Sequence, residues 1–268
     1  MKRDECVNHY SYFPSQNTDF FPTFSIYLNT SAYLVHSLFV RGTMTMEHNF
    51  YEGGISLEHY LAGVAAHVEP TLAIFFAAFI QSITGFGLVI IAAPLLMFFY
   101  EPKLTVPIML LLACSGNAVQ GFLMRKQANL PLIRWMYLGM LAGQPIGFFF
   151  FTYISNDALK VFINIVVLLS LLLMQISHRR IPECRRNTII TGMLSGFTAI
   201  TTGMGGLPFL IYLAYTSMPP NVFRATCFVY FFLGNATSLV SYLIGGFPLT
   251  AAFNEFIYLL PALALGII

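Results

Sequence analysis

The chain has 268 residues, of which 57% are hydrophobic and only 9% are charged, and its mean hydropathy is +0.73. Because about a quarter of the residues in a soluble globular domain are charged, this composition excludes a water-soluble globule and indicates an integral membrane protein. The net charge of +2, with no basic stripe interleaved with aromatic residues, also excludes a nucleic-acid partner.

The N-terminal part of the chain is its most polar part. Seven of the eleven acidic residues and five of the six histidines lie before position 70. We therefore predict a polar N-terminal extension over residues 1–65, followed by a membrane domain over residues 66–268. The stretch 20–40 is moderately apolar but contains Pro22 and Asn29, so a further span there is left open. A signal peptide is not predicted, because the first residues carry acids and lack an apolar core.

Seven apolar runs follow the extension. Each reaches the roughly 20 residues that a helix needs to cross about 30 Å of hydrocarbon. The sequence therefore predicts an all-α fold, a polytopic bundle of transmembrane helices. The runs cover residues 71–100, 104–124, 130–151, 158–176, 188–216, 222–243 and 249–268.

Basic residues predict the orientation of these runs. Seven of the thirteen lysines and arginines lie around two loops, at 125–134 and 178–186. Basic residues are enriched in cytoplasmic loops, and two apolar runs separate these two loops, so both can lie on one side. We predict a multi-pass protein of the cell membrane with both loops in the cytoplasm.

An internal repeat organises the membrane domain. Residues 79–118 recur as 197–236 at a constant offset of 118, without a gap. We place repeat one at about 71–176 and repeat two at about 188–268. The second copy ends one apolar run earlier than the first, so we expect it to lack its last helix. The offset pairs Thr84 with Thr202, Gly85 with Gly203, Gly87 with Gly205, Pro102 with Pro220 and Asn117 with Asn235.

Two of the apolar runs carry a glycine break near their middle. Each is about 30 residues long, which as an unbroken helix would measure roughly 45 Å, too long for one span and too short for two. A discontinuous helix or a half-span that re-enters explains this length. The two repeats are parallel if each broken run is one crossing and inverted if it is a hairpin. The sequence does not decide between them, and we favour the parallel arrangement.

The glycine breaks are the first candidates for a binding site. The freed N–H groups of the half-helix that follows a break present partial positive charge, which favours an anion. Two facing breaks can converge on one cavity, and the threonine before each break supplies a hydroxyl donor. Close helix packing is the alternative explanation for each single glycine. The candidates on the breaks are Thr84, Gly85, Gly87, Thr202, Gly203, Gly205 and Gly206.

Three amides extend this candidate site. Asn117 and Asn235 lie inside apolar runs, where an amide is costly unless it faces protein or a watery cavity, so both are expected to line the pathway or to bond between helices. Gln81 lies one helical turn before Gly85 and is a candidate donor to the substrate. Ala199 stands at the matching position of the second copy, so the site would be asymmetric.

Two further features receive structural interpretations. The glycines at 139, 143 and 147, and those at 192 and 196, have the GxxxG spacing that lets helices approach closely, and we assign them to packing. Glu255 is the one acid inside an apolar run after residue 70. It could pair with Arg224, line a cavity or lie at the membrane interface.

Motifs of enzymes and pumps are absent from the sequence. There is no Ser-His-Asp set, no HExxH and no phosphate-binding GxxxxGK[ST] sequence, and none of the four cysteines forms a CxxC pair. We therefore predict no enzymatic activity, no catalytic residue, no metal site, no cofactor and no ATP-driven step.

The glycine-rich segments resemble a known family. Residues 82–87 with Pro94, and residues 194–196 with 203–208, are similar to the two signatures of the sulfite exporter TauE/SafE family, also described as probable membrane transporter proteins. The resemblance covers about residues 66–268. It implies a multi-pass transporter, commonly of eight spans in two related halves, that moves sulfite, organosulfonates or other sulfur-containing anions. Leu88 stands where the family often has another glycine, so that half-site is expected to be narrower.

These observations lead to one preferred function and two alternatives. We predict a secondary transporter, a permease or exporter, of sulfite, an organosulfonate or a related oxyanion, working by alternating access. Its partners would be this small anion and the lipid bilayer, and homo-oligomerisation is left open. The alternatives are a non-transporting membrane scaffold or assembly partner and a truncated inactive family member.

Overall fold

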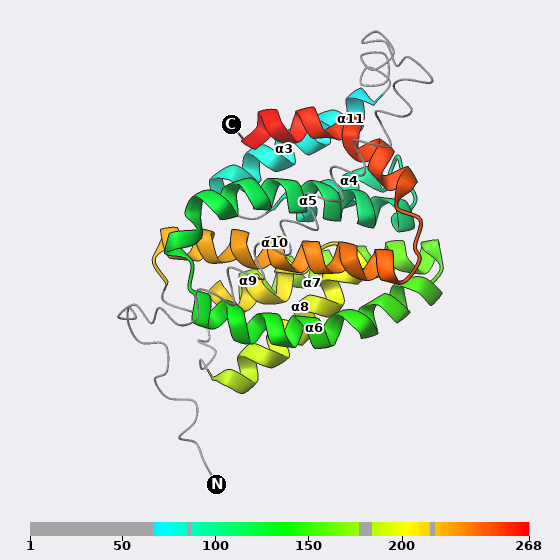
Figure 1. The fold of residues 1–268 in the computed structure, drawn as a ribbon. Helices are drawn as coiled ribbons and strands as arrows, with labels where there is room; N and C mark the ends of the chain where they lie inside the picture. The colour runs from blue at the N-terminus through cyan, green and yellow to red at the C-terminus, as the bar shows by residue number, and fades with distance from the viewer. Residues whose placement is uncertain (1–66, 85–86, 177–183, 215–217, 268) are drawn as a thin grey trace. The chain divides into compact units, whose positions relative to one another are not determined.

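The computed structural model describes residues 67–84, 87–176, 184–214 and 218–267, so the N-terminal extension and its 20–40 stretch lie outside the described residues. The predicted all-α bundle is confirmed, since the described residues form helices and contain no strand (Figure 1). The helices are α3 (Val68–Thr84), α4 (Leu88–Leu96), α5 (Pro102–Met124), the short 3-10 helix η3 (Arg125–Gln127), α6 (Leu130–Tyr153), α7 (Asn156–Ile176), α8 (Arg185–Thr202), α9 (Gly206–Ala214), α10 (Pro220–Ile244) and α11 (Thr250–Ile267).

Local sequence explains where several helices begin. The repeat-related Pro102 and Pro220 are the first residues of α5 and α10, where a proline has no intrahelical partner to lose. Asn129 caps α6, because its side chain accepts a hydrogen bond from the N–H of Leu132 at 3.2 Å. By length and composition, α5 continued by η3 (Pro102–Gln127), α10 and α11 are able to cross a membrane.

The second glycine break turns the chain into a hairpin. Thr188, near the start of α8, lies 3.0 Å from the hydroxyl of Tyr212, near the end of α9. Ser195 in the middle of α8 donates to the carbonyl of Gly205, so α9 runs back along α8. In the first break, α4 likewise packs against α3 (Figure 1). The re-entrant alternative is therefore the one that the structure adopts.

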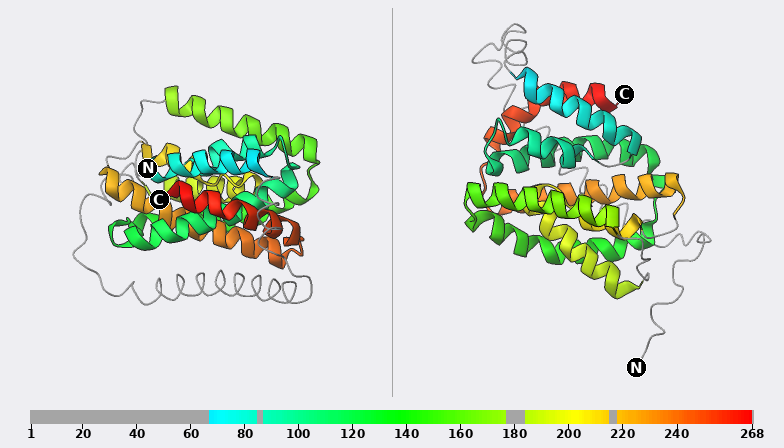
Figure 2. Two further views of the ribbon diagram at one scale, coloured as in Figure 1. Left: turned by 90° about the horizontal axis from the view of Figure 1, so that it is seen from above. Right: turned by 180° about the vertical axis from the view of Figure 1, so that it is seen from behind.

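The helices that the repeat pairs run in opposite directions. α5 and α10 lie side by side, and Figure 1 and, from behind, Figure 2 show that they start at opposite ends of the bundle. The backbone of Gly121, late in α5, packs on Phe228, early in α10, and the N–H of Asn129 beyond α5 donates to Thr226 at 3.0 Å. Our preference for parallel repeats is therefore wrong. Helix direction depends on packing between the copies, which their sequence similarity does not constrain.

The GxxxG series pack α6 against α8, as predicted. A Cβ atom on Gly139 would overlap the carbonyl oxygen of Ile189, and one on Gly143 would overlap that of Met193. In the other direction, Gly192 and Gly196 meet the backbone of α6 in the same way. Glycine lets the two helices touch backbone to backbone, and any larger residue would push them apart.

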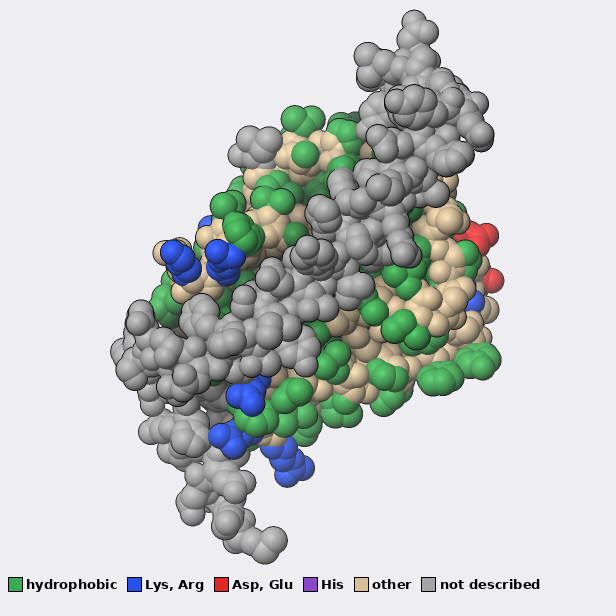
Figure 3. Space-filling model, in the orientation of Figure 1, with side chains coloured by type: hydrophobic (Ala, Val, Ile, Leu, Met, Phe, Trp, Pro, Cys, Tyr) green, Lys and Arg blue, Asp and Glu red, His purple; other side chains and the backbone are tan. Residues whose placement is uncertain are grey.

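Charged side chains gather at the two ends of the described bundle. Figure 3 shows most of the basic side chains toward one end and acidic ones toward the other. Arg125 and Lys126 follow α5, and Arg185 begins α8, at the same end. Glu101 precedes α5 and Asp157 lies in the first turn of α7, at the opposite end. The flanks between the ends are largely apolar, as expected of a surface that faces lipid (Figure 3).

Candidate functional site

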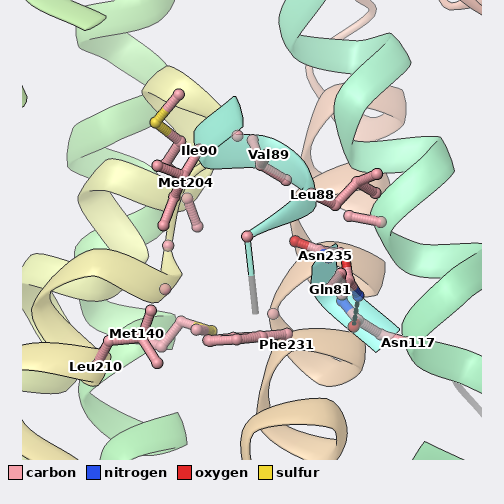
Figure 4. A pocket seen from close by; sticks show the side chains of 17 residues that line it. Gln81, Leu88, Val89, Ile90, Asn117, Met140, Met204, Leu210, Phe231 and Asn235 are labelled. Carbon is pink, nitrogen blue, oxygen red and sulfur yellow. Dashed lines mark hydrogen bonds between the residues drawn. The ribbon is translucent and has the colours of Figure 1, made fainter. Parts of the chain in front are cut away.

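A cavity of about 50 Å³ lies between the two broken runs (Figure 4). It has room for a few water molecules, since about 10–15 Å³ of such space admits one. Both copies of the repeat contribute to its wall, together with Met140 from α6. The predicted site residues on this wall are Gln81, Gly87, Asn117, Gly203, Gly205, Gly206 and Asn235.

Matching positions of the two copies meet at this cavity. Five positions line the wall in both copies at the offset of 118, although the paired residues differ in size at three of them and in polarity at one. A wall built from equivalent positions of two inverted halves is the arrangement found at the substrate sites of many transporters. The pairs are Gln81 with Ala199, Gly87 with Gly205, Leu88 with Gly206, Ala113 with Phe231, and Asn117 with Asn235.

Two half-helices begin at the cavity wall. Gly87 precedes α4 with φ 125°, a backbone conformation that favours glycine, and no side chain caps this end. Gly206 is the first residue of α9. The first N–H groups of each helix lack intrahelical partners and carry the positive end of the helix dipole. The cavity therefore has partial positive charge on two sides.

The amides add hydrogen-bonding groups to the wall. Gln81 on α3 donates from Nε2 to Oδ1 of Asn117 on α5 at 2.9 Å, and both side chains are buried (Figure 4). This bond occupies the acceptor of Asn117 and leaves its N–H groups as donors. The side chain of Asn235 lies at the cavity and forms no hydrogen bond with the residues that the structure describes. Such donors suit a ligand that accepts hydrogen bonds.

Comparison with protein-family models gives one match. The model of the sulfite exporter TauE/SafE family matches residues 71–268, which is most of the chain. The chain belongs to the sulfite exporter TauE/SafE family. The resemblance seen in the two glycine-rich segments is therefore confirmed, and the protein is a membrane protein of a transporter family. Searches of curated proteins and of solved structures found no match.

Hydrogen bonds hold the second break of this TauE/SafE protein in place. Gly203 has φ 72°, which ends α8 in a left-handed conformation. Tyr230 on α10 donates to Ser195 at 2.9 Å, and Ser195 donates to the carbonyl of Gly205. The matching first-copy positions hold Leu112 and Ala77, which cannot make these bonds. The second break is thus anchored by a polar network that has no counterpart at the first.

The predicted threonines are the least supported members of the site. Thr202 is buried beside the break but is not on the cavity wall. Its hydroxyl donates to the carbonyl of Thr198 at 2.7 Å and accepts from the N–H of Met204 at 3.1 Å, so it holds the break instead of facing a ligand. Gly85 and the side chain of Thr84 lie outside the described residues.

Ten of the wall residues were not predicted as site residues, and Phe231 and Met140 are two of them. Phe231 lies on α10 four residues before Asn235, so helical spacing places both on one face and could have indicated it. Met140 comes from α6, outside the aligned segments 79–118 and 197–236, and no pattern in the sequence points to it.

No acidic or basic side chain is among the described residues that line the cavity. Glu255 accepts a hydrogen bond from Tyr100 at 2.7 Å, and Arg224 donates to the carbonyl of Ser82 at 2.6 Å. Tyr100 lies just before α5 and Arg224 lies early in α10, and these helices start at opposite ends of the bundle, so the suggested pair of Glu255 with Arg224 is wrong. On the described part of the wall, the groups that attract an anion are helix ends and amides.

Proposed function

We propose that this TauE/SafE protein is a secondary transporter of a small anion, namely sulfite, an organosulfonate or a related oxyanion. One observation carries the proposal: the two half-helices α4 and α9 start at the wall of one shared cavity. Half-helix ends pointing at a mid-membrane site are a recurrent way for transporters to bind anionic groups. The exporter family to which the chain belongs supports the same substrate class.

The described part of the cavity wall carries no charged side chain, which favours release of an anion as well as binding. A lysine or arginine in the cavity would hold an anion strongly, whereas helix dipoles and neutral amides attract it more weakly. The amides of Asn117 and Asn235 would donate to the oxygen atoms of the anion. Moderate affinity of this kind suits a site that has to bind the anion on one side and release it on the other.

Opposite helix directions in the two halves support alternating access. In inverted repeats, rocking one half against the other exchanges an inward-open arrangement for an outward-open one around a fixed site. We further propose a multi-pass topology in which the end carrying Arg125, Lys126 and Arg185 faces the cytoplasm. The loops 125–134 and 178–186 would then lie on that side.

The decisive experiment measures sulfite flux in proteoliposomes that contain the purified full chain. Asn235→Leu removes the amide at the cavity while keeping a side chain of similar size, and we expect it to lower the flux per molecule about tenfold or more. Asn221→Leu is the matched control, because Asn221 is exposed in the first turn of the same helix. Equal flux in the wild type and Asn235→Leu would reject the assigned site, and a wild type without flux of any tested oxyanion would reject the transporter.

The scaffold alternative makes a different prediction about glycine substitutions. Gly205→Leu is expected to abolish flux, but a Cβ on Gly205 would lie 2.5 Å from that of Ala199, so this change also disturbs packing against α8. Abundance and flux therefore have to be measured together. A scaffold would lose abundance without any flux to lose, whereas a transporter loses flux per inserted molecule.

A further inference from the structure

At two paired positions of the cavity wall, the large and the small residue are swapped between the two copies. In the first copy, the half-helix α4 begins with Leu88, and the α5 position that matches Phe231 in the register is Ala113. In the second copy, α9 begins with Gly206, and the facing position on α10 is Phe231. All four residues line the cavity, so side-chain volume comes from the half-helix in one copy and from the neighbouring long helix in the other.

The ring of Phe231 occupies the space that Gly206 leaves open. A Cβ atom on Gly206 would lie 2.8 Å from Cζ of Phe231 and 3.1 Å from its Cε1. The ring therefore rests against the first residue of α9, where the free N–H groups of that half-helix begin. Phe209 packs on it edge to face, with the ring centroids 5.3 Å apart, which limits the positions that the ring can take.

We propose that Phe231 sets the size of the anion site and makes the protein select compact inorganic oxyanions over sulfonates that carry an alkyl chain. This inference rests on the proposed transport function. A cavity of about 50 Å³ holds a compact anion, and an attached chain would have to displace the ring at the wall. Leu88 lines the other half and is fully buried, whereas Phe231 is only half-buried, so Phe231 is the better residue to shorten in a test.

The pairing of positions between the two copies suggests a direct test of this inference. Phe231→Ala should enlarge the half of the cavity that the second copy lines. G206L/F231A should fill that space again, because the double variant reproduces the Leu88 and Ala113 arrangement of the first copy. G206L alone would drive a side chain into the ring and should impair transport of every anion. Removing a block of several methylene-sized groups from a pocket changes discrimination by about tenfold or more.

The experiment compares uptake of labelled sulfite with uptake of 1-propanesulfonate in proteoliposomes of the full chain. We expect the wild type to prefer sulfite, F231A to raise the relative rate of propanesulfonate about tenfold or more, and G206L/F231A to return toward the wild-type ratio. F231L, a smaller change, gives an intermediate ratio and carries the test if F231A does not insert. F232A removes a phenylalanine next to Phe231 that is off the cavity wall and should leave the ratio unchanged.

The possible outcomes separate the role of Phe231 from the transport function. A wild type that moves sulfite, combined with an unchanged ratio in both F231A and F231L, overturns the role of Phe231 and leaves the transport proposal intact. The same shift in F232A would also overturn it, because a general loosening of α10 would then explain the result. A wild type that moves neither anion overturns the transport function itself.

Discussion

Gln81 donates a hydrogen bond to Asn117 across the first half of the cavity, at 2.9 Å. The bond joins α3 to α5 one helical turn before the first glycine break, and both side chains are buried. It orients the Asn117 amide so that its N–H groups remain as donors. At the matching position Ala199 offers no such group, so only one of the two repeat-related asparagines is held by a glutamine.

Gln81→Ala should weaken anion binding while leaving the fold intact. The change makes the two copies alike at this position but leaves the Asn117 acceptor without its partner, at a cost of about 1–3 kcal/mol. If the orientation of the Asn117 amide affects only the bound anion, the sulfite concentration that gives half-maximal flux should rise roughly 5- to 150-fold. Concentration-dependent flux in proteoliposomes checks this, and an unchanged half-maximal concentration would contradict it.

Tyr230→Phe and Ser195→Ala should both loosen the second break. Each removes a link between Tyr230, Ser195 and the carbonyl of Gly205, and we expect a loss of about 1–2 kcal/mol in the free energy of unfolding for each. Because the bonds form one chain, the double variant should lose less than the sum of the two. Thermal unfolding in detergent measures all three, and strict additivity would argue against a connected network.

Gly143→Ala should impair folding more than Gly116→Ala. A Cβ on Gly143 meets the backbone of Met193, which cannot move away without separating α6 from α8, and overpacking of this kind costs about 1–3 kcal/mol. A Cβ on Gly116 meets only the side-chain ends of Ile267 and Leu263, which can adjust. The yield of monodisperse protein and its melting temperature compare the two variants. Equal stability would show that the α6–α8 contact is not limiting.

Arg224→Gln should destabilise the end of α3. The Arg224 side chain donates to the carbonyl of Ser82 in the last turn of that helix, where a cation also offsets the helix dipole. We expect a loss of up to about 2 kcal/mol, with Arg224→Lys in between because lysine keeps the charge but not the planar fork. Thermal unfolding ranks the variants. A lysine variant less stable than the glutamine variant would rule out the charge as the cause.

Cysteine labelling should place the two charged ends on opposite sides of the membrane. In a variant whose four native cysteines are replaced, Lys126→Cys should react with an impermeant maleimide only after the cytoplasmic side is exposed. Asp157→Cys should react in intact cells, because it lies at the other end of the bundle. Labelling of both positions from the same side would contradict the proposed topology.

Composition and the 118-residue register by themselves determined the membrane class, the all-α fold and the segments that contain the breaks. They did so because apolar run length and glycine position are properties of a short stretch of chain. The sequence also named seven residues that lie on one cavity wall. It did not indicate Met140, because that residue lies outside the aligned segments 79–118 and 197–236 and reaches the wall through the packing of α6.

Only the tertiary structure decided the direction of the two halves and the size of the site. Whether a broken run crosses or turns back depends on contacts such as Thr188 with Tyr212, between residues that lie far apart on separate helices. In the sequence, the exchange of Leu88 and Ala113 for Gly206 and Phe231 is two mismatched pairs of the register, 25 residues apart, with no sign that they share a site. The exchange becomes apparent only when packing brings the four residues to one cavity. The total side-chain volume at the wall is then seen to be similar in the two halves, although the volume at each position differs.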